Sequence, residues 1–198
     1  MTTAKRTYLI LALAALIALA GSAVTLASGP ASAAGDLSLY VSSTNTKSVL
    51  AYDGETGAFQ RKFARGGGLT EPEGIAFGPD GNLYVSSRSD EVLRYDGQTG
   101  NFIDVFASGH GLVDPAGIAF GGPGKDLFVG SGLTDEGRGN QILRFDGATG
   151  AFEAVVDPAN AAGLDDPEAL AFGRDGLLYV TSTPETTPGE VLRYDPAN

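Results

Sequence analysis

Residues 74–106 read GIAFGPDGNLYVSSRSDEVLRYDGQTGNFIDVF, and this succession of short apolar runs and turns decides the fold. Four strand-length runs, rich in aromatic and β-branched residues, are separated by clusters of Gly, Pro, Asp and Asn. The run LYVS at 83–86 has counterparts that begin at residues 39, 127 and 178, so the copies start 44, 44 and 51 residues apart. A repeat of this length built only of strands is typical of propeller blades.

The repeats therefore predict an all-β protein, a β-propeller whose blades are four-stranded antiparallel sheets. With the strands of a blade labelled a to d from the axis outward, the chain supplies b, c and d, then two full sets, then a, b and c. This amounts to about three and a half blades. Three explanations stay open: a fragment of a longer product, an open arc that self-associates through its bare sheet edges, or a compact four-bladed ring.

The first 33 residues have the features of a secretory signal peptide. Lys5 and Arg6 precede an apolar run from Tyr8 to Ala20, and Ala31-Ser32-Ala33 offers small residues for cleavage. The prediction is a signal peptide over 1–33, a partial propeller over 34–198, and a secreted or periplasmic protein. An uncleaved signal acting as a membrane anchor is the alternative. The chain has no cysteine, which excludes disulfides and thiolate chemistry.

The charge of the chain is strongly negative. It carries 24 acidic and 13 basic residues, a net charge of −11, and all the acids lie beyond residue 33. Such a balance excludes nucleic acid as a partner and disfavours an anionic membrane surface. The acids are dispersed, which is typical of a solubilising surface.

Residues 71–86, EPEGIAFGPDGNLYVS, resemble the core of the NHL-repeat propellers. They also resemble the related six-bladed propellers of the gluconolactonase and senescence-marker-protein family and the streptogramin lyases. The resemblance extends over residues 36–195 and implies an incomplete propeller of the six-bladed type. Because one such scaffold carries binding proteins, hydrolases and lyases, the resemblance leaves the chemistry open.

The position just before strand a holds Glu73, Ala116 and Glu168 in successive repeats. In the gluconolactonase-like family this position carries ligands of the catalytic divalent metal, so the resemblance implies Glu73 and Glu168 as metal ligands. Oxygen donors suit Ca²⁺, Mg²⁺ or Mn²⁺, of which Ca²⁺ is the first expectation. Ala116 departs from the pattern. The competing interpretation is that both glutamates are solvated loop acids.

Three further features have a structural and a functional interpretation. His110 is the only histidine, and it is either a general base or an exposed loop residue. The repeated Asp-Gly-x-Thr-Gly at 53, 96 and 146 is interpreted as a hairpin turn that needs positive φ, because a calcium loop would have more carboxylates. Arginines 94, 144 and 193 recur in strand c, which favours salt bridges between blades or a solvated sheet edge.

Two functions follow from the sequence. The first is a secreted binding or scaffold propeller that recognises an extracellular protein, peptide, glycan or small molecule through its variable loops. The alternative is a metal-dependent lactone hydrolase or a lyase, with Glu73 and Glu168 on the metal and His110 as the candidate base. The sequence leaves open whether the protein is an enzyme.

Overall fold

In the computed structural model the described residues are 37–133, 139–157, 160–184 and 188–197. They form fourteen strands and no helix. The strands are β1 (Ser38–Ser43), β2 (Ser48–Asp53), β3 (Phe59–Arg65), β4 (Pro72–Phe77), β5 (Leu83–Ser87), β6 (Glu91–Tyr95), β7 (Phe102–Ser108), β8 (Pro115–Gly121), β9 (Asp126–Leu133), β10 (Gly139–Phe145), β11 (Phe152–Val156), β12 (Pro167–Phe172), β13 (Leu178–Ser182) and β14 (Glu190–Tyr194).

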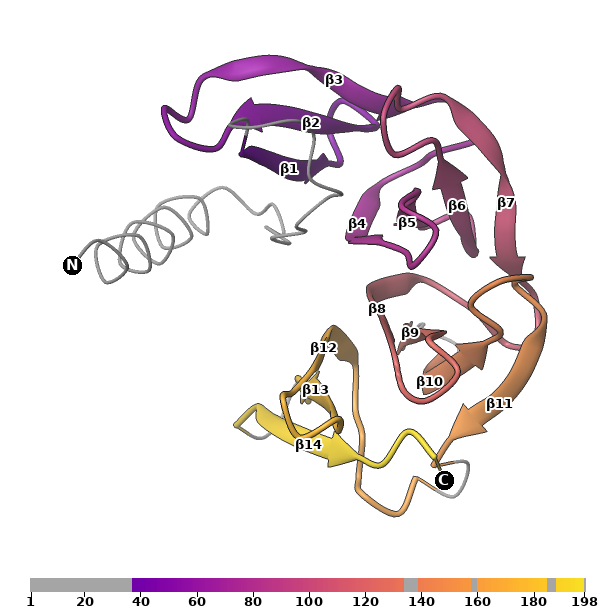
Figure 1. Cartoon of the computed structure of the whole chain (residues 1–198). Coiled ribbons are helices and arrows are strands. Elements are labelled where there is room, and N and C mark those ends of the chain that lie inside the picture. Colours follow the sequence, from indigo (N-terminus) through magenta and orange to yellow (C-terminus); the bar gives the residue numbers. More distant parts are fainter. Residues whose placement is uncertain (1–36, 134–138, 158–159, 185–187, 198) are drawn as a thin grey trace.

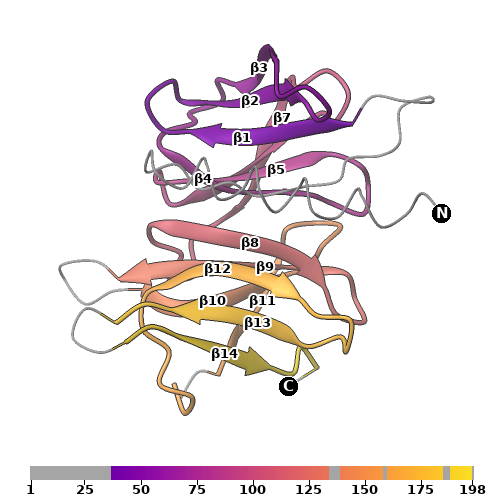
Figure 2. The same ribbon diagram turned by 90° about the vertical axis from the view of Figure 1, so that its left-hand side faces the viewer.

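The strands form four antiparallel sheets, which are the blades of an open arc (Figure 1). The first blade has the order β1-β2-β3, the second β4-β5-β6-β7, the third β8-β9-β10-β11 and the fourth β12-β13-β14. The innermost strands β4, β8 and β12 run beside one another on the concave side (Figure 2). In the described part of the chain, the first blade has strands b to d and the fourth has strands a to c. The predicted succession of fourteen strands is confirmed.

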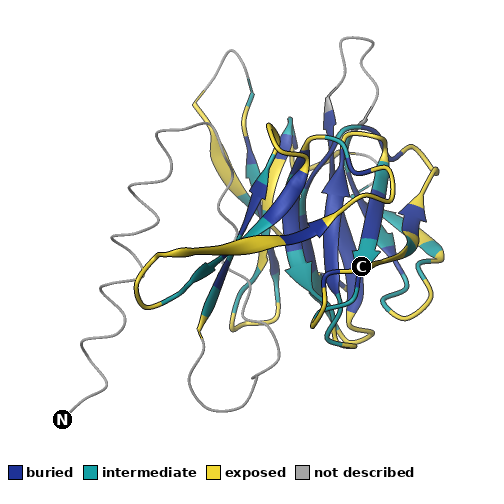
Figure 3. Ribbon diagram, turned by 90° about the horizontal axis from the view of Figure 1, so that it is seen from above, coloured by how far each residue is buried: buried dark blue, intermediate teal, exposed yellow. Residues whose placement is uncertain are grey.

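The apolar core lies between the blades rather than within any one of them. Val49 and Phe63 of the first blade cluster with Leu83 and Tyr95 of the second. Two further clusters join the second blade to the third and the third to the fourth. Buried residues accordingly gather where sheets face one another, and exposed residues lie in the loops and outer strands (Figure 3). Each blade therefore depends on its neighbours for stability.

One aromatic pair repeats at each of these interfaces. The ring that follows the first leucine of strand b meets the phenylalanine of strand a in the next blade, edge to face. The pairs are Tyr40 with Phe77, Tyr84 with Phe120, and Phe128 with Phe172, with ring centroids 5.2, 4.7 and 5.3 Å apart. Edge-to-face pairs stabilise beyond the area that they bury, so the repeat carries its own interface contact.

Glycine allows the inner strands to approach closely. A Cβ atom on Gly74 would lie 2.4 Å from the carbonyl oxygen of Ala116, and one on Gly117 would lie 2.6 Å from that of Glu168. The same repeat position in the fourth blade is Ala169, whose side chain is exposed. Glycine is thus present where another inner strand follows, and alanine where none follows among the described residues.

The Asp-Gly-x-Thr-Gly segments are turns, as predicted, but the reason for their first glycine differs from the expectation. Asp96 Oδ1 accepts hydrogen bonds from the Thr99 amide at 2.7 Å and its hydroxyl at 2.8 Å. The positive φ falls on the last glycine, Gly100, at 76°. Gly97 has no positive φ, but a Cβ atom there would collide with the carbonyl oxygen of Gly81. This position is therefore glycine because the two turns of the blade pack closely against each other.

The predicted signal peptide and cleavage site lie outside the described residues. In the part of the chain that the structure describes, no helix is long and apolar enough to cross a membrane.

Replacing Gly74 with alanine is expected to destabilise the protein by about 1–3 kcal/mol, because the new methyl group must displace the backbone of the third blade. Chemical denaturation followed by circular dichroism measures this change. Ala169→Ser is the matched control at the same repeat position and is expected to leave the stability within about 0.5 kcal/mol of the wild type. Equal effects of the two substitutions would contradict the close-approach explanation.

Candidate functional site

The two glutamates expected at the propeller axis lie at the start of inner strands. Glu73 belongs to β4 and Glu168 to β12, while Ala116 holds the equivalent place in β8 between them. Because β4, β8 and β12 are neighbours, three blades contribute to this end of the concave surface (Figure 2). They were expected just before strand a, and the structure has them within it, as the second residues of β4 and β12.

A buried serine at the end of strand b fixes the loop that leads into each inner strand. Its hydroxyl accepts a hydrogen bond from a loop amide and donates one to the carbonyl of the same residue, at distances of 2.8–3.0 Å. The three pairs are Ser87 with Thr70, Ser131 with Val113, and Ser182 with Asp165. Since a buried hydroxyl must be satisfied, this repeat holds the loop in one conformation.

Each of these loops ends in an acidic residue followed by proline. Glu71, Asp114 and Asp166 have φ angles of 41°, 43° and 46°, a left-handed conformation that is uncommon for residues other than glycine. A residue before proline normally prefers an extended conformation. The Asp114 amide donates a hydrogen bond to Asp90 Oδ1 at 2.9 Å, and the Asp166 amide donates one to Asn140 Oδ1 at 2.7 Å. The repeat thus fixes one acid per blade beside the inner strand.

Arg88, from the loop between β5 and β6, joins three of the acids of this region. Its Nε lies 3.0 Å from Glu73 Oε1 and 2.8 Å from Asp114 Oδ1, and its Nη1 lies 3.6 Å from Glu71 Oε2. We call Glu71, Glu73, Arg88, Asp114, Asp166 and Glu168 the inner-rim cluster. It contains five carboxylates and one guanidinium, so its net charge is strongly negative.

Burial, and after it the excess of negative charge, raises the pKa values of the acids in the cluster. Burial raises the pKa of Glu73, with Asp114 and Glu168 adding to the rise and Arg88 opposing it. Burial likewise raises the pKa of Glu168, and the charge of Asp166 adds to it. The pKa of Asp114 is also raised, mainly by burial. Although burial acts to lower the pKa of Arg88, the neighbouring acids outweigh it and raise that pKa.

As arranged, the inner-rim cluster does not fit a divalent metal. Glu73 Oε1 already has the Arg88 guanidinium as its counter-cation, and Glu168 has no donor within hydrogen-bonding distance of its side chain in the described residues. Neither glutamate belongs to the one group of described acids whose oxygens converge within 4.8 Å. Metal binding by Glu73 and Glu168 remains a prediction, and it requires Arg88 to move.

His110 lies apart from the inner-rim cluster. Its ring stacks on Phe152 of β11, with centroids 4.4 Å apart and planes 2° from parallel. Because β11 is the outermost strand of the third blade, the imidazole lies at the outside of the arc, whereas Glu73 and Glu168 begin innermost strands. The exposed ring and its φ of 55° fit the loop-residue interpretation, and the general-base role remains a prediction.

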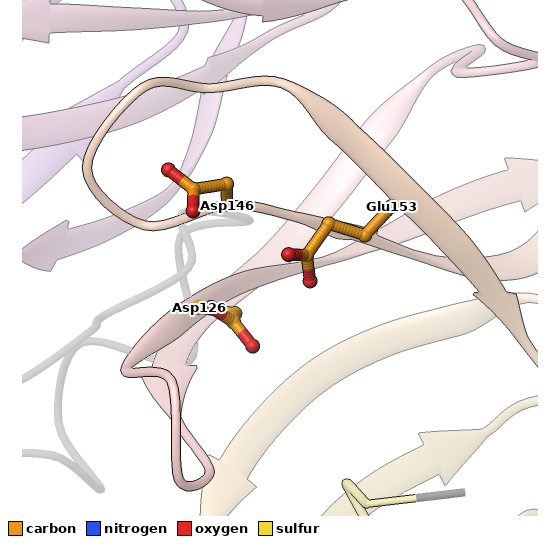
Figure 4. A group of neighbouring side chains, drawn as sticks. All are labelled: Asp126, Asp146 and Glu153. Atoms are coloured by element: carbon orange, nitrogen blue, oxygen red, sulfur yellow. The ribbon is translucent and has the colours of Figure 1, made fainter.

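A second acidic group lies in the third blade. Asp126, Asp146 and Glu153 come together at one end of this sheet (Figure 4). The Arg144 Nε lies 3.0 Å from Asp126 Oδ2 and 2.6 Å from Glu153 Oε2, so a guanidinium already provides the positive charge there. Asp146 Oδ1 caps its own turn, accepting from the Thr149 amide at 2.7 Å. We therefore assign a structural role to this group, in which Arg144 neutralises Glu153 and the buried Asp126.

The salt bridges of the repeated arginines connect strands of the same blade, which corrects the expectation of inter-blade pairs. Arg94 binds Asp104 of the adjacent strand, Nε to Oδ1 at 3.0 Å, and its guanidinium lies over the Phe106 ring. The link between blades in the third repeat is a hydrogen bond instead, from Arg144 Nη1 to the Pro196 carbonyl at 3.0 Å. The arginines stabilise the blades and form no basic patch among the described residues.

Sequence reasoning missed Arg88 and Asp114 as members of the cluster. The repeated acid–proline pair before strand a, at 71–72, 114–115 and 166–167, was a signal that could have identified Asp114. For Arg88 the sequence offered none, because its counterparts in the other repeats are not arginine and its partners are 15 or more residues away.

Known proteins share this architecture. Residues 62–95 match the family described as strictosidine synthase-like, N-terminal. A structure of Kuenenia stuttgartiensis hydrazine synthase is similar with a TM-score of 0.63 at 23% identity, over 81% of this chain and 43% of that one. The WD40 β-propeller domain of Doa1 gives 0.57 at 15% identity, over 79% and 45%. The fold is a partial β-propeller, and only its segment 62–95 is similar to the strictosidine synthase-like family.

This partial propeller spans less than half the length of either solved structure. At these identities the likeness establishes the fold alone. No curated protein matches the chain. The propeller architecture expected from the NHL-like repeats is confirmed, whereas the gluconolactonase-like activity remains a prediction.

Arg144→Met is expected to destabilise the protein by about 3 kcal/mol, because Asp126, only 3% exposed, would keep a buried charge without its cation. Urea denaturation measures the loss. Arg193→Met, at the same position of the fourth blade and exposed, is the control and is expected to cost little. A loss from Arg193→Met as large as that from Arg144→Met would contradict the assignment.

Glu168→Gln is expected to raise the melting temperature at pH 7.5 and to have less effect near pH 4.5. A carboxyl whose folded pKa is raised favours folding when protonated, and this contribution disappears as the pH rises through that pKa. Thermal unfolding at the two pH values provides the test. Asp96→Ala is the opposite control: hydrogen bonds from Thr99 lower the Asp96 pKa, so this substitution should lower the melting temperature at pH 7.5.

Proposed function

We propose that this protein is a secreted binding module whose inner-rim cluster recognises a positively charged group, such as a protonated amine or a basic side chain of a peptide. The observation that carries the proposal is the gathering of five carboxylates from three blades, three of which pair with a single guanidinium. Arg88 shows what kind of group suits this surface. Secretion is supported by the basic and apolar N-terminal segment and its small-residue cleavage motif.

The electrostatics favour a cationic ligand over an anionic or neutral one. Burial and mutual repulsion raise the pKa values of Glu73, Asp114 and Glu168, so an added positive charge would relieve an existing penalty. Glu168 has no donor of its own among the described residues and is therefore the acid we expect to contact the ligand first. Rigid loops, held by the buried serines, would limit the ordering cost of binding.

The alternative is a metal-dependent lactone hydrolase in which Glu73 and Glu168 hold the ion. It is supported by their equivalent places at the start of inner strands, since the resemblance to the gluconolactonase-like family implies metal ligands at this repeat position. It is opposed by the Arg88 guanidinium, which lies on Glu73. The binding function needs no such rearrangement and is preferred.

Tetralysine with blocked ends is expected to bind the protein in isothermal titration calorimetry, with an affinity that falls as salt is added. Glu168→Gln should weaken binding about three-fold, the effect of removing one partly exposed charge. Asp175→Asn removes one charge from the turn at the other end of the fourth blade and should leave the affinity unchanged. Equal weakening by both variants would mean attraction to the overall charge and would overturn the proposal.

Calcium chloride titrated in the same calorimeter distinguishes the alternative. Calcium binding that is lost in a Glu73→Gln, Glu168→Gln double variant would favour the metal site. An unchanged calcium affinity in that variant would rule out Glu73 and Glu168 as the ligands of the ion.

A further inference from the structure

One residue of each strand c packs against the following blade, and at one end of the arc this residue is exposed. Val49, Val92 and Ile142 hold this position in the first three blades and are fully buried. Val191 holds it in the fourth blade and is 62% exposed. The exposure does not come from a polar substitution, because the residue is still an aliphatic one. The fourth blade therefore presents an interface surface that nothing among the described residues covers.

The opposite end of the arc exposes the complementary half of the same interface. In the second and third blades, the strand-c residues that face the preceding blade are Leu93, Tyr95, Leu143 and Phe145, all fully buried. Their counterparts in the first blade, Leu50 and Tyr52, are only partly buried. Leu37, just before β1, is 61% exposed. Among the described residues, one end of the arc thus has no preceding blade and the other has no following one.

The repeat itself shows that these two surfaces match. In the interface between the first two blades, Val49 lies in one apolar cluster with Leu93 and Tyr95. Val191 is the counterpart of Val49, and Leu50 and Tyr52 are the counterparts of Leu93 and Tyr95. Packing the fourth blade against a first blade would therefore recreate the part of this contact that strands b and c make.

The inner strands favour a first blade over a further complete blade at this place. Gly74 and Gly117 are glycines because the next inner strand lies against them, and a Cβ atom would collide with it. The fourth blade has Ala169 instead, with its methyl group exposed. A complete blade packed in the usual way would meet this methyl group, whereas the described first blade has β1, a strand b, as its innermost strand and would not.

We propose that the exposed face of the fourth blade binds the first blade of a second copy of this chain. The contact is head to tail, with Val191 of one copy against Leu50 and Tyr52 of the other. Two copies that exchange both contacts would close a ring around one channel, as a heterologous interface does when its rotation closes. In such a ring, two inner-rim clusters would surround the same axis. The proposed association does not depend on what those clusters bind.

Contact through the faces differs from pairing through the sheet edges. Leu50 lies in β2, which is hydrogen-bonded to β1 on one side and to β3 on the other, so its strand has no free edge. A charge at Leu50 would therefore disturb face packing and leave edge pairing intact. This residue separates the two modes of association.

The experiment is light scattering after size-exclusion chromatography of the full chain, produced in a secreting host. The wild type is expected to be a dimer at tens of micromolar. Val191→Glu and Leu50→Lys should each weaken association at least ten-fold. A mixture of the two variants should recover the dimer, because it restores one native contact and pairs the introduced carboxylate with the introduced ammonium at the other. Val105→Glu, an exposed apolar position on β7, is the matched control and should remain dimeric.

A monomeric wild type would overturn the proposal. So would a dimer that persists in Leu50→Lys, which would indicate edge pairing instead. Recovery in the mixture also shows that both variants are folded, so a loss of association in the single variants cannot be attributed to misfolding.

Discussion

The packing of one blade on the next is the interaction on which the rest of this structure depends. Each sheet is apolar on both faces, and residues such as Leu83 and Tyr84, adjacent in sequence, belong to different inter-blade clusters. Such a sheet is stable only between two others, because a single blade has no interior in which to bury both faces. The arc, the close approach at Gly74 and Gly117, and the uncovered surfaces at its two ends all follow from this constraint.

The same repeat that builds the core also builds the inner-rim cluster. The buried serine of strand b fixes a loop, the loop holds an acid before proline in a left-handed conformation, and stacking brings the acids of successive blades together. The individual parts are structural, since each satisfies a buried polar group or a turn. Their combination concentrates negative charge at one end of the concave surface, where Arg88, which has no arginine counterpart in the other repeats, joins three of the acids.

Equivalent residues of the repeats have different roles because their neighbours differ. Arg94 pairs with Asp104 beside an aromatic ring, whereas Arg144 supports the buried Asp126, and Arg193 is exposed. His110 occupies the position that Gly67 holds one repeat earlier. Phe102 of β7 limits the space at Gly67, and its counterpart in the next repeat, Phe152 of β11, is the ring on which the imidazole stacks. A role assigned from position in the repeat therefore held for the core and failed for several charged residues.

The sequence by itself determined the strands, their order in each blade and the incomplete set at both ends, because alternation, turn residues and repeat length are local properties of the chain. It also placed Glu73 and Glu168 at the inner strands. The tertiary structure alone decided that Arg88 joins Glu73 to Asp114 and that His110 turns to the outer strand. It alone decided that Val191 is exposed and that Leu50 is only partly buried. These outcomes depend on distances between residues remote in sequence, which the spacing of motifs does not encode.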